Sequence, residues 1–404
     1  MSETFKATQI TDTVWWVGAI DWDVRNFHGY RTGRGTTYNA FLIVAEKVTL
    51  VDTVKHEFYD EMMARIASVV DPTTIDVIIS NHAEMDHTGC LPKTINAVNP
   101  SAVYCSKMGQ RALVAHFGEL DLIAVDEGQQ IDLGGATISF VETKMCHWPD
   151  SMVTYLHEDE LLFSQDAFGM HFASHQRYAD KLESGAMQYE AAKYYANILL
   201  HLSPFIDKTL TKMDGLGLPV KILAPDHGPI YRTPELIDWI LSSYARWAAQ
   251  APTNKAVVVY DSMWHSTATL AKLIGEGLVE GGVDEVCLLS LAEAHRSDVV
   301  TELLEAGALV VGSPTMNNNI LPSVADIMTY LKGLKPRNLI GGAFGSFGWS
   351  GEAPKHLQAM LEEMGAEKVT DPLRVNYVPD ETEQAAAREF GLAIAAALKE
   401  KLAT

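Results

Sequence analysis

The sequence has few cysteines, and no two of them lie close together. The four cysteines form no C-x-x-C pair, which excludes a zinc-ribbon type of knuckle within the chain. Such spacing is typical of a reducing compartment, so we expect a cytoplasmic protein. The N-terminal segment lacks the basic stretch and apolar core of a secretory signal, and no run approaches the roughly 18 apolar residues that span a bilayer. We therefore expect no membrane association.

Positive charge is also scarce. The chain has 31 lysines and arginines against 52 aspartates and glutamates, which gives a formal net charge of −21. Such a charge repels the phosphates of nucleic acids and of anionic lipids, so a nucleic-acid-binding function is disfavoured. A length of 404 residues with 47% hydrophobic residues predicts a globular protein of two or three domains.

Ionisable residues are concentrated just after one short apolar run. Residues 75–79 (IDVII) predict a buried strand, and residues 80–87 (SNHAEMDH) follow it directly. The motif supplies four potential metal ligands, His82, Glu84, Asp86 and His87. Ionisable groups this close to a buried strand are costly unless a positive ion lies among them. A solvated loop is the alternative interpretation.

Three further ligand candidates follow strand-like runs in a similar way. They are His147, Asp166 and His227, and the strands predicted before them are 136–142, 160–164 and 221–224. A single histidine of this kind is more often structural than a ligand. Loops at one edge of a sheet sandwich would bring all seven side chains together. Their shared position after strands favours a metal site over coincidence.

The other patterns in the first 250 residues predict the rest of a first domain. Strands are expected at 13–17, 37–44, 48–51, 102–105 and 152–156, with 37–44 and 48–51 forming a hairpin. Helices are expected at 56–69, 108–117, 186–202 and 233–249. Thr233 as N-cap, Pro234 and Glu235 favour the start of the last helix. Residues 250–254 are a predicted linker, so we expect domains at 1–250 and 255–404.

From residue 255 strands and helices alternate regularly, which predicts a parallel sheet. The expected strands are 255–260, 285–290, 308–312, 338–344 and a weak one at 367–375, and a helix at 381–403 closes the chain. Five such units in about 150 residues predict a flavodoxin-like doubly wound fold.

Three loops in this half fall at the carboxyl ends of strands, where such folds bind ligands. The first, residues 261–267, offers hydroxyl and amide donors at a helix N-terminus, which suits a phosphate dianion without a lysine. The others are residues 312–319 and 345–352. Phe347 and Trp349 in the third loop could be simple hydrophobic cover, but burial would normally place such residues on strands.

The motif H-x-E-x-D-H at 82–87, followed by His147, Asp166 and His227, resembles the metallo-β-lactamase-like domain of flavodiiron proteins. The stretches DSMWHSTA and GGAFGSFGWSGE resemble the same family. The resemblance covers essentially the whole chain. It implies an N-terminal metallo-β-lactamase-like αββα sandwich followed by a C-terminal flavodoxin-like doubly wound parallel sheet, an α/β and α+β two-domain protein.

The resemblance also implies a non-haem di-iron centre. One iron would be bound by His82, Glu84 and His147, the other by Asp86, His87 and His227, with Asp166 bridging them. Hydrolases of the wider superfamily carry a histidine where this chain has Glu84. A carboxylate makes the site harder and richer in oxygen, which shifts preference from zinc toward iron or manganese. Four side chains around the site are candidates to donate protons or hydrogen bonds: His28, Tyr30, His171 and Tyr195.

The second implied cofactor is FMN, with its phosphate on the first loop and its isoalloxazine ring between the other two. The first loop contributes Ser262, Met263, Trp264, His265, Ser266 and Thr267. The other two contribute Pro314, Thr315, Asn317, Asn319, Ser346, Phe347, Gly348, Trp349 and Gly351.

The family resemblance implies an oxidoreductase that reduces O2 to water, NO to N2O, or both. Reduced FMN stores two electrons and a di-ferrous pair two more, which together match the four electrons that O2 requires. The chain has no cysteine knuckle, haem motif or nicotinamide-binding fingerprint. We therefore expect an external electron donor, which the resemblance implies is rubredoxin-like. The short linker and the family resemblance both favour a head-to-tail homodimer, or a dimer of dimers.

Two other functions fit parts of the sequence. A zinc hydrolase of the metallo-β-lactamase superfamily could carry an appended flavodoxin-like domain, and it would contain two zincs and show esterase or nuclease activity. An FMN electron carrier could use the first domain as a metal-free scaffold. The complete set of seven ligands argues against the carrier.

Overall fold

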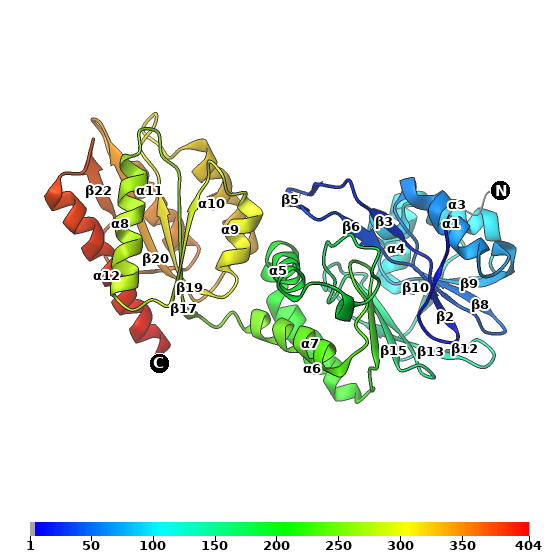
Figure 1. Ribbon diagram of the computed structural model, residues 1–404. Helices are drawn as coiled ribbons and strands as arrows, with labels where there is room; N and C mark the ends of the chain where they lie inside the picture. The colour runs from blue at the N-terminus through cyan, green and yellow to red at the C-terminus, as the bar shows by residue number, and fades with distance from the viewer. Residues whose placement is uncertain (1–4, 404) are drawn as a thin grey trace. The chain divides into compact units, whose positions relative to one another are not determined.

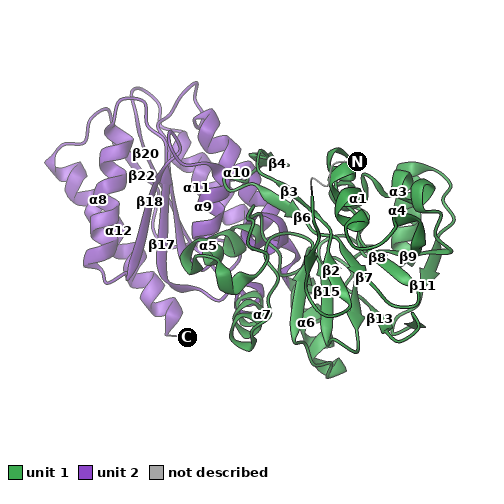
Figure 2. Ribbon diagram, turned by 45° about the vertical axis from the view of Figure 1, so that its right-hand side comes forward, with its two compact units in different colours: residues 1–194, 204–245 green, residues 195–203, 246–404 purple. Residues whose placement is uncertain are grey.

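The computed structural model describes residues 5–403, which form two compact units (Figure 2). The first unit runs to Tyr194 and includes residues 204–245. The second unit contains residues 195–203 and continues from Arg246. Figure 1 labels the helices and strands of both. Among the helices between residues 5 and 403, we find no candidate that could span a bilayer.

Two sheets form the centre of the first unit. The first has the order β1-β2-β7-β8-β9-β10-β11, and its strands are β1 (Thr8–Gln9), β2 (Val14–Trp16), β7 (Phe41–Ile43), β8 (Val48–Val51), β9 (Ile75–Ser80), β10 (Ala102–Ser106) and β11 (Ile123–Val125). The second has the order β12-β13-β14-β15-β16, and its strands are β12 (Gln130–Asp132), β13 (Thr137–Glu142), β14 (Met152–Leu156), β15 (Leu161–Gln165) and β16 (Ile222–Pro225). β8, β9, β10 and β11 run parallel to one another, as do β15 and β16. Two small pairs stand apart from these sheets, β3 (Ala19–Asp21) with β6 (Thr36–Tyr38) and β4 (Asn26–Phe27) with β5 (Tyr30–Arg31).

Apolar side chains fill the space between the two sheets and the space outside them. Between the sheets, the rings of Phe41 on β7 and Phe163 on β15 lie 5.1 Å apart, and both are fully buried. On the outer face of the first sheet, Met62 and Leu113 pack against strand residues such as Ile78. The helices on that face are α1 (Tyr59–Ala67), α3 (Leu91–Val98) and α4 (Lys107–Phe117). Helices α6 (Ser203–Leu216) and α7 (Pro234–Ala249) lie on the second sheet. These layers confirm the predicted αββα sandwich.

The second unit is a doubly wound sheet with the strand order β18-β17-β19-β20-β21, with β22 also paired to β20. Its strands are β17 (Thr253–Tyr260), β18 (Glu285–Ser290), β19 (Ala306–Gly312), β20 (Ile340–Phe347), β21 (Glu367–Lys368) and β22 (Leu373–Asn376). All of these pairs are parallel, and the order is the flavodoxin-like one. Figure 1 shows α8 (Ser266–Glu280) and α12 (Glu381–Leu402) on one face and α9 (Arg296–Leu303) and α10 (Pro322–Leu334) on the other. Helix α11 (Ala353–Glu363) packs along β20.

Three sequence-predicted elements differ from the structure. The strand expected at 37–44 divides into β6 and β7, because β6 pairs with β3 whereas β7 pairs with β2 and β8. The helix expected at 186–202 is α-helical from Ser184 to Tyr194, and a π segment and a 3-10 turn then continue it to Leu202. The weak strand expected at 367–375 is β21 and β22, separated by a segment that contains Pro372, which has no N–H to donate. The strands β1, β3, β4, β5, β11 and β12 and the helices α3 and α6 were not predicted.

The carboxyl ends of several strands in the first unit point to one edge. β9 ends at Ser80, β15 at Gln165 and β16 at Pro225, and a loop follows β13 after Glu142. The seven predicted ligands lie directly or shortly after these ends. The sheet sandwich therefore provides a rigid base for a site made of loop residues.

Candidate functional site

The seven predicted metal ligands come together in two neighbouring groups. Within each group, one ligand atom from every residue lies within 4.8 Å of the others. The first group is His82, Glu84, His147 and Asp166, and the second is Asp86, His87 and His227. Six of the side chains are buried, and His147 is half-buried.

The carboxylate of Asp166 joins the two groups. Its Oδ2 lies 2.9 Å from Nε2 of His147 and 3.4 Å from Nε2 of His82. Its Oδ1 lies 3.1 Å from Nε2 of His87 and 3.4 Å from Nε2 of His227. Each oxygen therefore faces a different pair of imidazoles, which is the geometry of a carboxylate that bridges two metal ions.

The other two carboxylates each belong to one group. Glu84 Oε2 lies 3.2 Å from Nε2 of His147 and 3.4 Å from Nε2 of His82. Asp86 Oδ2 lies 3.1 Å from Nε2 of His227, and its Oδ1 lies 3.4 Å from Nε2 of His87. Each group thus offers two imidazoles, one carboxylate of its own and one oxygen of the shared carboxylate.

Two of the imidazoles, those of His82 and His227, are hydrogen-bonded through Nδ1, and the Nδ1 of a third, His87, faces a carboxylate. Nδ1 of His82 lies 3.2 Å from Oδ2 of Asp150, which also accepts a hydrogen bond from the Ala83 amide at 2.6 Å. Nδ1 of His87 lies 3.6 Å from Oδ2 of Asp226, and Nδ1 of His227 donates to the Thr37 carbonyl at 2.6 Å. An acceptor at Nδ1 fixes the ring orientation, so that Nε2 is left to bind a metal. Sequence reasoning missed Asp150 and Asp226, although both lie within three residues of a predicted ligand.

Gln165 supports the bridging aspartate. Its backbone has a φ of 49°, in the left-handed region. Its Oε1 accepts from the Asp166 amide at 2.6 Å, and its Nε2 donates to the carbonyl of Cys146, next to His147. Its own carbonyl accepts from the Asp226 amide at 2.8 Å. One residue therefore connects, through its side chain and its carbonyl, the loops that carry three predicted ligands, and nothing in the sequence pattern distinguishes it.

The chemistry of the cluster fits two metal cations. Both oxygens of Asp86, Nε2 of His87 and Oδ1 of Asp166 are buried without a hydrogen-bond partner, an arrangement that is costly unless cations bind them. Burial alone would raise the pKa of Asp166, but the neighbouring imidazoles of His87 and His147 hold that pKa well below its usual range. The cluster offers four imidazoles and three carboxylates. Such a set of nitrogen and oxygen donors suits iron, whereas structural zinc sites are usually rich in sulfur.

The side chains predicted around the metal ligands have different positions. Nε2 of His28, an exposed residue, lies 3.4 Å from Oε1 of Glu84. His171 is buried, its Nδ1 is 2.9 Å from the Thr36 hydroxyl, and its ring centroid is 4.8 Å from that of His227. Burial and the nearby His227 lower the pKa of His171 well below its usual value, so its ring is neutral. The ring of Tyr30 lies 5.1 Å from the ring of His171.

The tyrosine beside this cluster is Tyr194 and not Tyr195. The ring of Tyr194 lies 5.2 Å from that of His171 and 6.2 Å from that of His227. Tyr195 instead pairs its hydroxyl with Ser203 at 3.1 Å, and its ring contacts Trp247. Tyr194 is the last residue of the α-helical segment and Tyr195 is the first residue of the π segment, and the position expected for Tyr195 is occupied by its neighbour.

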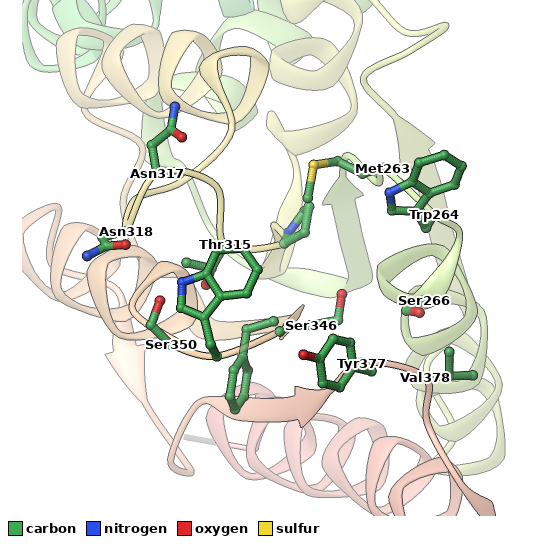
Figure 3. Close-up of a pocket in the computed structure, with 14 residues that line it drawn as sticks. Met263, Trp264, Ser266, Thr315, Asn317, Asn318, Ser346, Ser350, Tyr377 and Val378 are labelled. Carbon is green, nitrogen blue, oxygen red and sulfur yellow. The ribbon is translucent and has the colours of Figure 1, made fainter.

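A second site is a cavity of about 470 Å³ in the second unit (Figure 3). It lies at the carboxyl ends of β17, β19, β20 and β22. The predicted residues that line it are Met263, Trp264, Ser266, Pro314, Thr315, Asn317, Ser346, Phe347, Gly348 and Trp349. The side chains of Trp264 and Trp349 are 88% and 89% exposed, so two indole faces are available to cover a flat aromatic ligand.

The first loop of this cavity has the features of a phosphate site. Helix α8 begins at Ser266, after His265 in the left-handed region with a φ of 67°. The amides of its first turn are unpaired within the helix, and the helix dipole adds positive potential. The hydroxyl of Ser262 is buried without a hydrogen-bond partner, whereas that of Thr267 pairs with Ser346 at 3.0 Å. The cavity and this loop together fit a phosphorylated flat ligand such as FMN.

Five predicted residues of these loops do not line the cavity, namely Ser262, His265, Thr267, Asn319 and Gly351. Gly351 leaves space for the guanidinium of Arg374, which donates to the Gly351 carbonyl at 3.0 Å. Four other residues line it, Asn318, Ser350, Tyr377 and Val378. The last two follow β22, and the rule that ligands bind at carboxyl strand ends would have found them had the weak strand been followed to its end.

Comparisons with known proteins agree with both sites. A family model described as "ODP family beta lactamase" matches residues 36–228, and one described as "Flavodoxin" matches 258–391. The chain is 43% identical to the rubredoxin-oxygen oxidoreductase of Megalodesulfovibrio gigas over 98% of this chain and 100% of the relative. It is also 43% identical to the nitric oxide reductase of Moorella thermoacetica, over 96% of this chain and 98% of the relative.

Solved structures give the same result. The rubredoxin oxygen:oxidoreductase of Desulfovibrio gigas has a TM-score of 0.96 and 42% identity, covering 99% of this chain and 100% of that chain. The flavodiiron protein of Giardia intestinalis has a TM-score of 0.94 and 30% identity, covering 98% of each. The chain belongs to the flavodiiron protein family. The name of the family states its cofactors, a flavin and two irons, and the two sites of this flavodiiron protein fit them.

Replacing Asp166 with asparagine tests the bridge. An amide carries no negative charge to share between two cations, so we expect Asp166→Asn to bind iron more weakly. Loss of a residue that only supports a metal ligand typically costs about 10–100-fold in affinity, and loss of the bridge should cost no less. Iron analysis after dialysis and Mössbauer spectroscopy measure the content and the magnetic coupling. Asp159→Asn, which alters a carboxylate bonded to Thr11 and Thr13, is the control. Two coupled irons in Asp166→Asn would contradict the bridging role.

Proposed function

We propose that this flavodiiron protein reduces O2 to water, NO to N2O, or both, at a di-iron centre in its first unit, with electrons that pass through FMN in its second. The observation that carries the proposal is the division of the Asp166 carboxylate between two imidazole pairs. The names of the two relatives at 43% identity, an oxygen oxidoreductase and a nitric oxide reductase, support the two substrates.

The residues of the chain prepare the site for this chemistry. Bound iron and FMN supply the redox chemistry. Asp166, Glu84 and Asp86 bring three negative charges that offset most of the charge of two divalent cations. Both reductions also consume protons, and His28 lies exposed with Nε2 3.4 Å from Oε1 of Glu84, where it is placed to pass a proton from solvent toward the ligands. The buried rings of Tyr30, His171 and Tyr194 form an aromatic cluster next to His227 and exclude water there.

Cofactor analysis with turnover measurements tests the proposed function. We expect protein purified without oxygen to contain two irons and one FMN per chain and to turn over O2 or NO when both are compared in one assay. Two zincs with esterase or nuclease activity would point to a hydrolase. A metal-free protein that still passes electrons would point to a carrier, and either result would contradict the proposal.

We infer that the electron donor is a separate rubredoxin-like protein. The described residues and the full sequence contain no cysteine knuckle, and the four cysteines are free. We expect reduced rubredoxin to reduce the bound FMN within the turnover time, while NADH alone reduces it far more slowly. Stopped-flow absorbance of the flavin measures both rates. Reduction by NADH alone as fast as turnover would contradict this inference.

The cysteines also support a cytoplasmic location. Cys90, Cys105 and Cys146 are buried, and Cys287 is half-buried. Burial raises the pKa of Cys105 and of Cys146 to about 12, so these thiols stay protonated and react slowly. Free thiols of this kind persist in reducing compartments.

We further propose a head-to-tail homodimer in which the FMN of one chain serves the di-iron centre of the other. Helix α7 ends at Ala249 and β17 begins at Thr253, so the main connection between the two folds is only three residues long. Such a short connection limits how the flavin of a chain can reach the di-iron centre of the same chain. A partner related by a two-fold axis can present its flavin there instead.

Complementation tests the trans arrangement. One chain carries His147→Ala with Asp166→Ala and lacks iron, and the other carries Ser262→Ala with Ser266→Asp, whose added charge repels the FMN phosphate. Each variant alone should be inactive, and co-expression should restore activity because a mixed dimer keeps one intact pair of cofactors. Mixed dimers isolated with two affinity tags that remain inactive would contradict the arrangement.

A further inference from the structure

The turn that carries His227 has its own support, apart from the contacts of the histidine ring. The turn comprises residues 225–228 and directly follows β16. Nε2 of His227 must lie near Oδ1 of Asp166 and Oδ2 of Asp86, at the observed 3.4 and 3.1 Å. A ligand on a turn keeps such a position only when surrounding groups hold the backbone.

Asn39, between β6 and β7, provides that hold. Its Nδ2 donates to the carbonyls of Pro225 at 2.7 Å and Gly228 at 3.0 Å. Its backbone amide donates to the carbonyl of Asp226 at 2.7 Å. Asn39 is 1% exposed, so water does not compete for these bonds. Three of the four carbonyls in the turn are therefore held by one residue, which touches no metal-ligand side chain.

The orientation of the Asn39 amide is fixed by Trp16. The indole Nε1 of Trp16 donates to Oδ1 of Asn39 at 2.8 Å. Because an indole N–H can only donate, the atom that faces it must be the amide oxygen, and Nδ2 must then face the turn. Trp16 itself is buried between the guanidiniums of Arg65 and Arg177, which lie 4.7 and 4.2 Å from its ring.

Close backbone approach makes this arrangement possible. A Cβ at Gly18 would collide with the carbonyl of Tyr38 and crowd the backbone of Asn39, so a larger residue would push the Asn39 segment away from the turn. On the same segment, the Thr37 hydroxyl accepts from the Gly228 amide at 2.7 Å, and the Thr37 carbonyl accepts from Nδ1 of His227 at 2.6 Å. Residues 37–39 therefore hold both the 225–228 turn and the imidazole ring of His227.

We infer that Asn39 is a positioning residue for the second iron of the centre, acting through the 225–228 turn, with Trp16 setting the direction of its amide. The inference rests on the proposed function, because it assumes that His227 binds that iron. It concerns only one of the two irons, since the hydrogen bonds of Asn39 go to Trp16 and to the 225–228 turn.

Asn39→Asp is the decisive variant. A carboxylate has the same shape and still accepts from Trp16, but it cannot donate to the two carbonyls and repels them. We expect the second iron to bind roughly 10–100-fold more weakly, the usual effect of losing support around a ligand, so that dialysed protein keeps about one iron per chain. The FMN content should stay at the wild-type value.

Asn197→Asp is the matched control in the second unit. Asn197 is also buried, its Nδ2 donates to the Ser297 carbonyl at 3.1 Å, and its Oδ1 accepts from the Tyr330 hydroxyl at 3.0 Å. The Asn197→Asp variant should keep both irons even if the substitution lowers the stability of the protein. Trp16→Phe keeps an aromatic ring but loses the N–H donor, so it should weaken binding of the second iron less than Asn39→Asp does.

Iron per chain, competition with a chelator series and Mössbauer spectra measure these effects on full-length protein purified without oxygen. Loss of one of two inequivalent iron signals in Asn39→Asp supports the inference, and wild-type chelator competition in that variant overturns it. If Asn39→Asp does not fold, as judged by circular dichroism and FMN content, Trp16→Phe decides by the same criterion. Fewer than two irons in the wild-type protein would instead contradict the proposed function.

Discussion

The first unit depends on the burial of negative charge at one edge of its sheet sandwich. Glu84, Asp86 and Asp166 are all buried, and Asp166 must stay ionised to serve two imidazole pairs. A carboxylate removed from water is stable only when positive charge and hydrogen bonds replace its hydration. The strand ends, the loops and the residues behind the imidazoles can all be understood as ways of meeting that requirement.

The surrounding carboxylates extend the same constraint outward. Asp52 and Asp226 are fully buried near His87, and burial raises the pKa of Asp52 to about 6 and that of Asp226 well above its usual value. Asp52 accepts two hydrogen bonds from Asn81 at 2.7 Å each, whereas the carboxylate oxygens of Asp226 have no hydrogen-bond partner. The ionised form of the Asp226 carboxyl group therefore depends most on positive charge at the metal centre, which acts on it through the imidazole of His87. Metal binding and the stability of this edge are consequently coupled.

The sequence allowed the ligands to be predicted because their chemistry and their position after strands are both local patterns. It also allowed the doubly wound second unit to be predicted, since β-α alternation is regular there. The residues that hold the ligands were missed for a physical reason. Gln165, Asn39 and Asp150 act through backbone carbonyls and amides of segments distant in sequence, and no spacing rule relates Asn39 to a turn 186 residues later. The sequence pattern also did not indicate which of the two adjacent tyrosines, Tyr194 or Tyr195, lies beside the ligands.

The two units meet their ligand requirements in opposite ways. The metal site concentrates charged side chains and buries them, so its geometry needs rigid support from both sheets. The flavin cavity contains no lysine or arginine among its lining residues, and it uses helix-terminal amides, hydroxyls and exposed aromatic faces instead. A site of that second kind stays open to solvent, as the exposure of Trp264 and Trp349 indicates. Openness suits the proposed exchange of electrons with a separate donor protein, while enclosure suits a centre where incompletely reduced oxygen or nitrogen species must not escape.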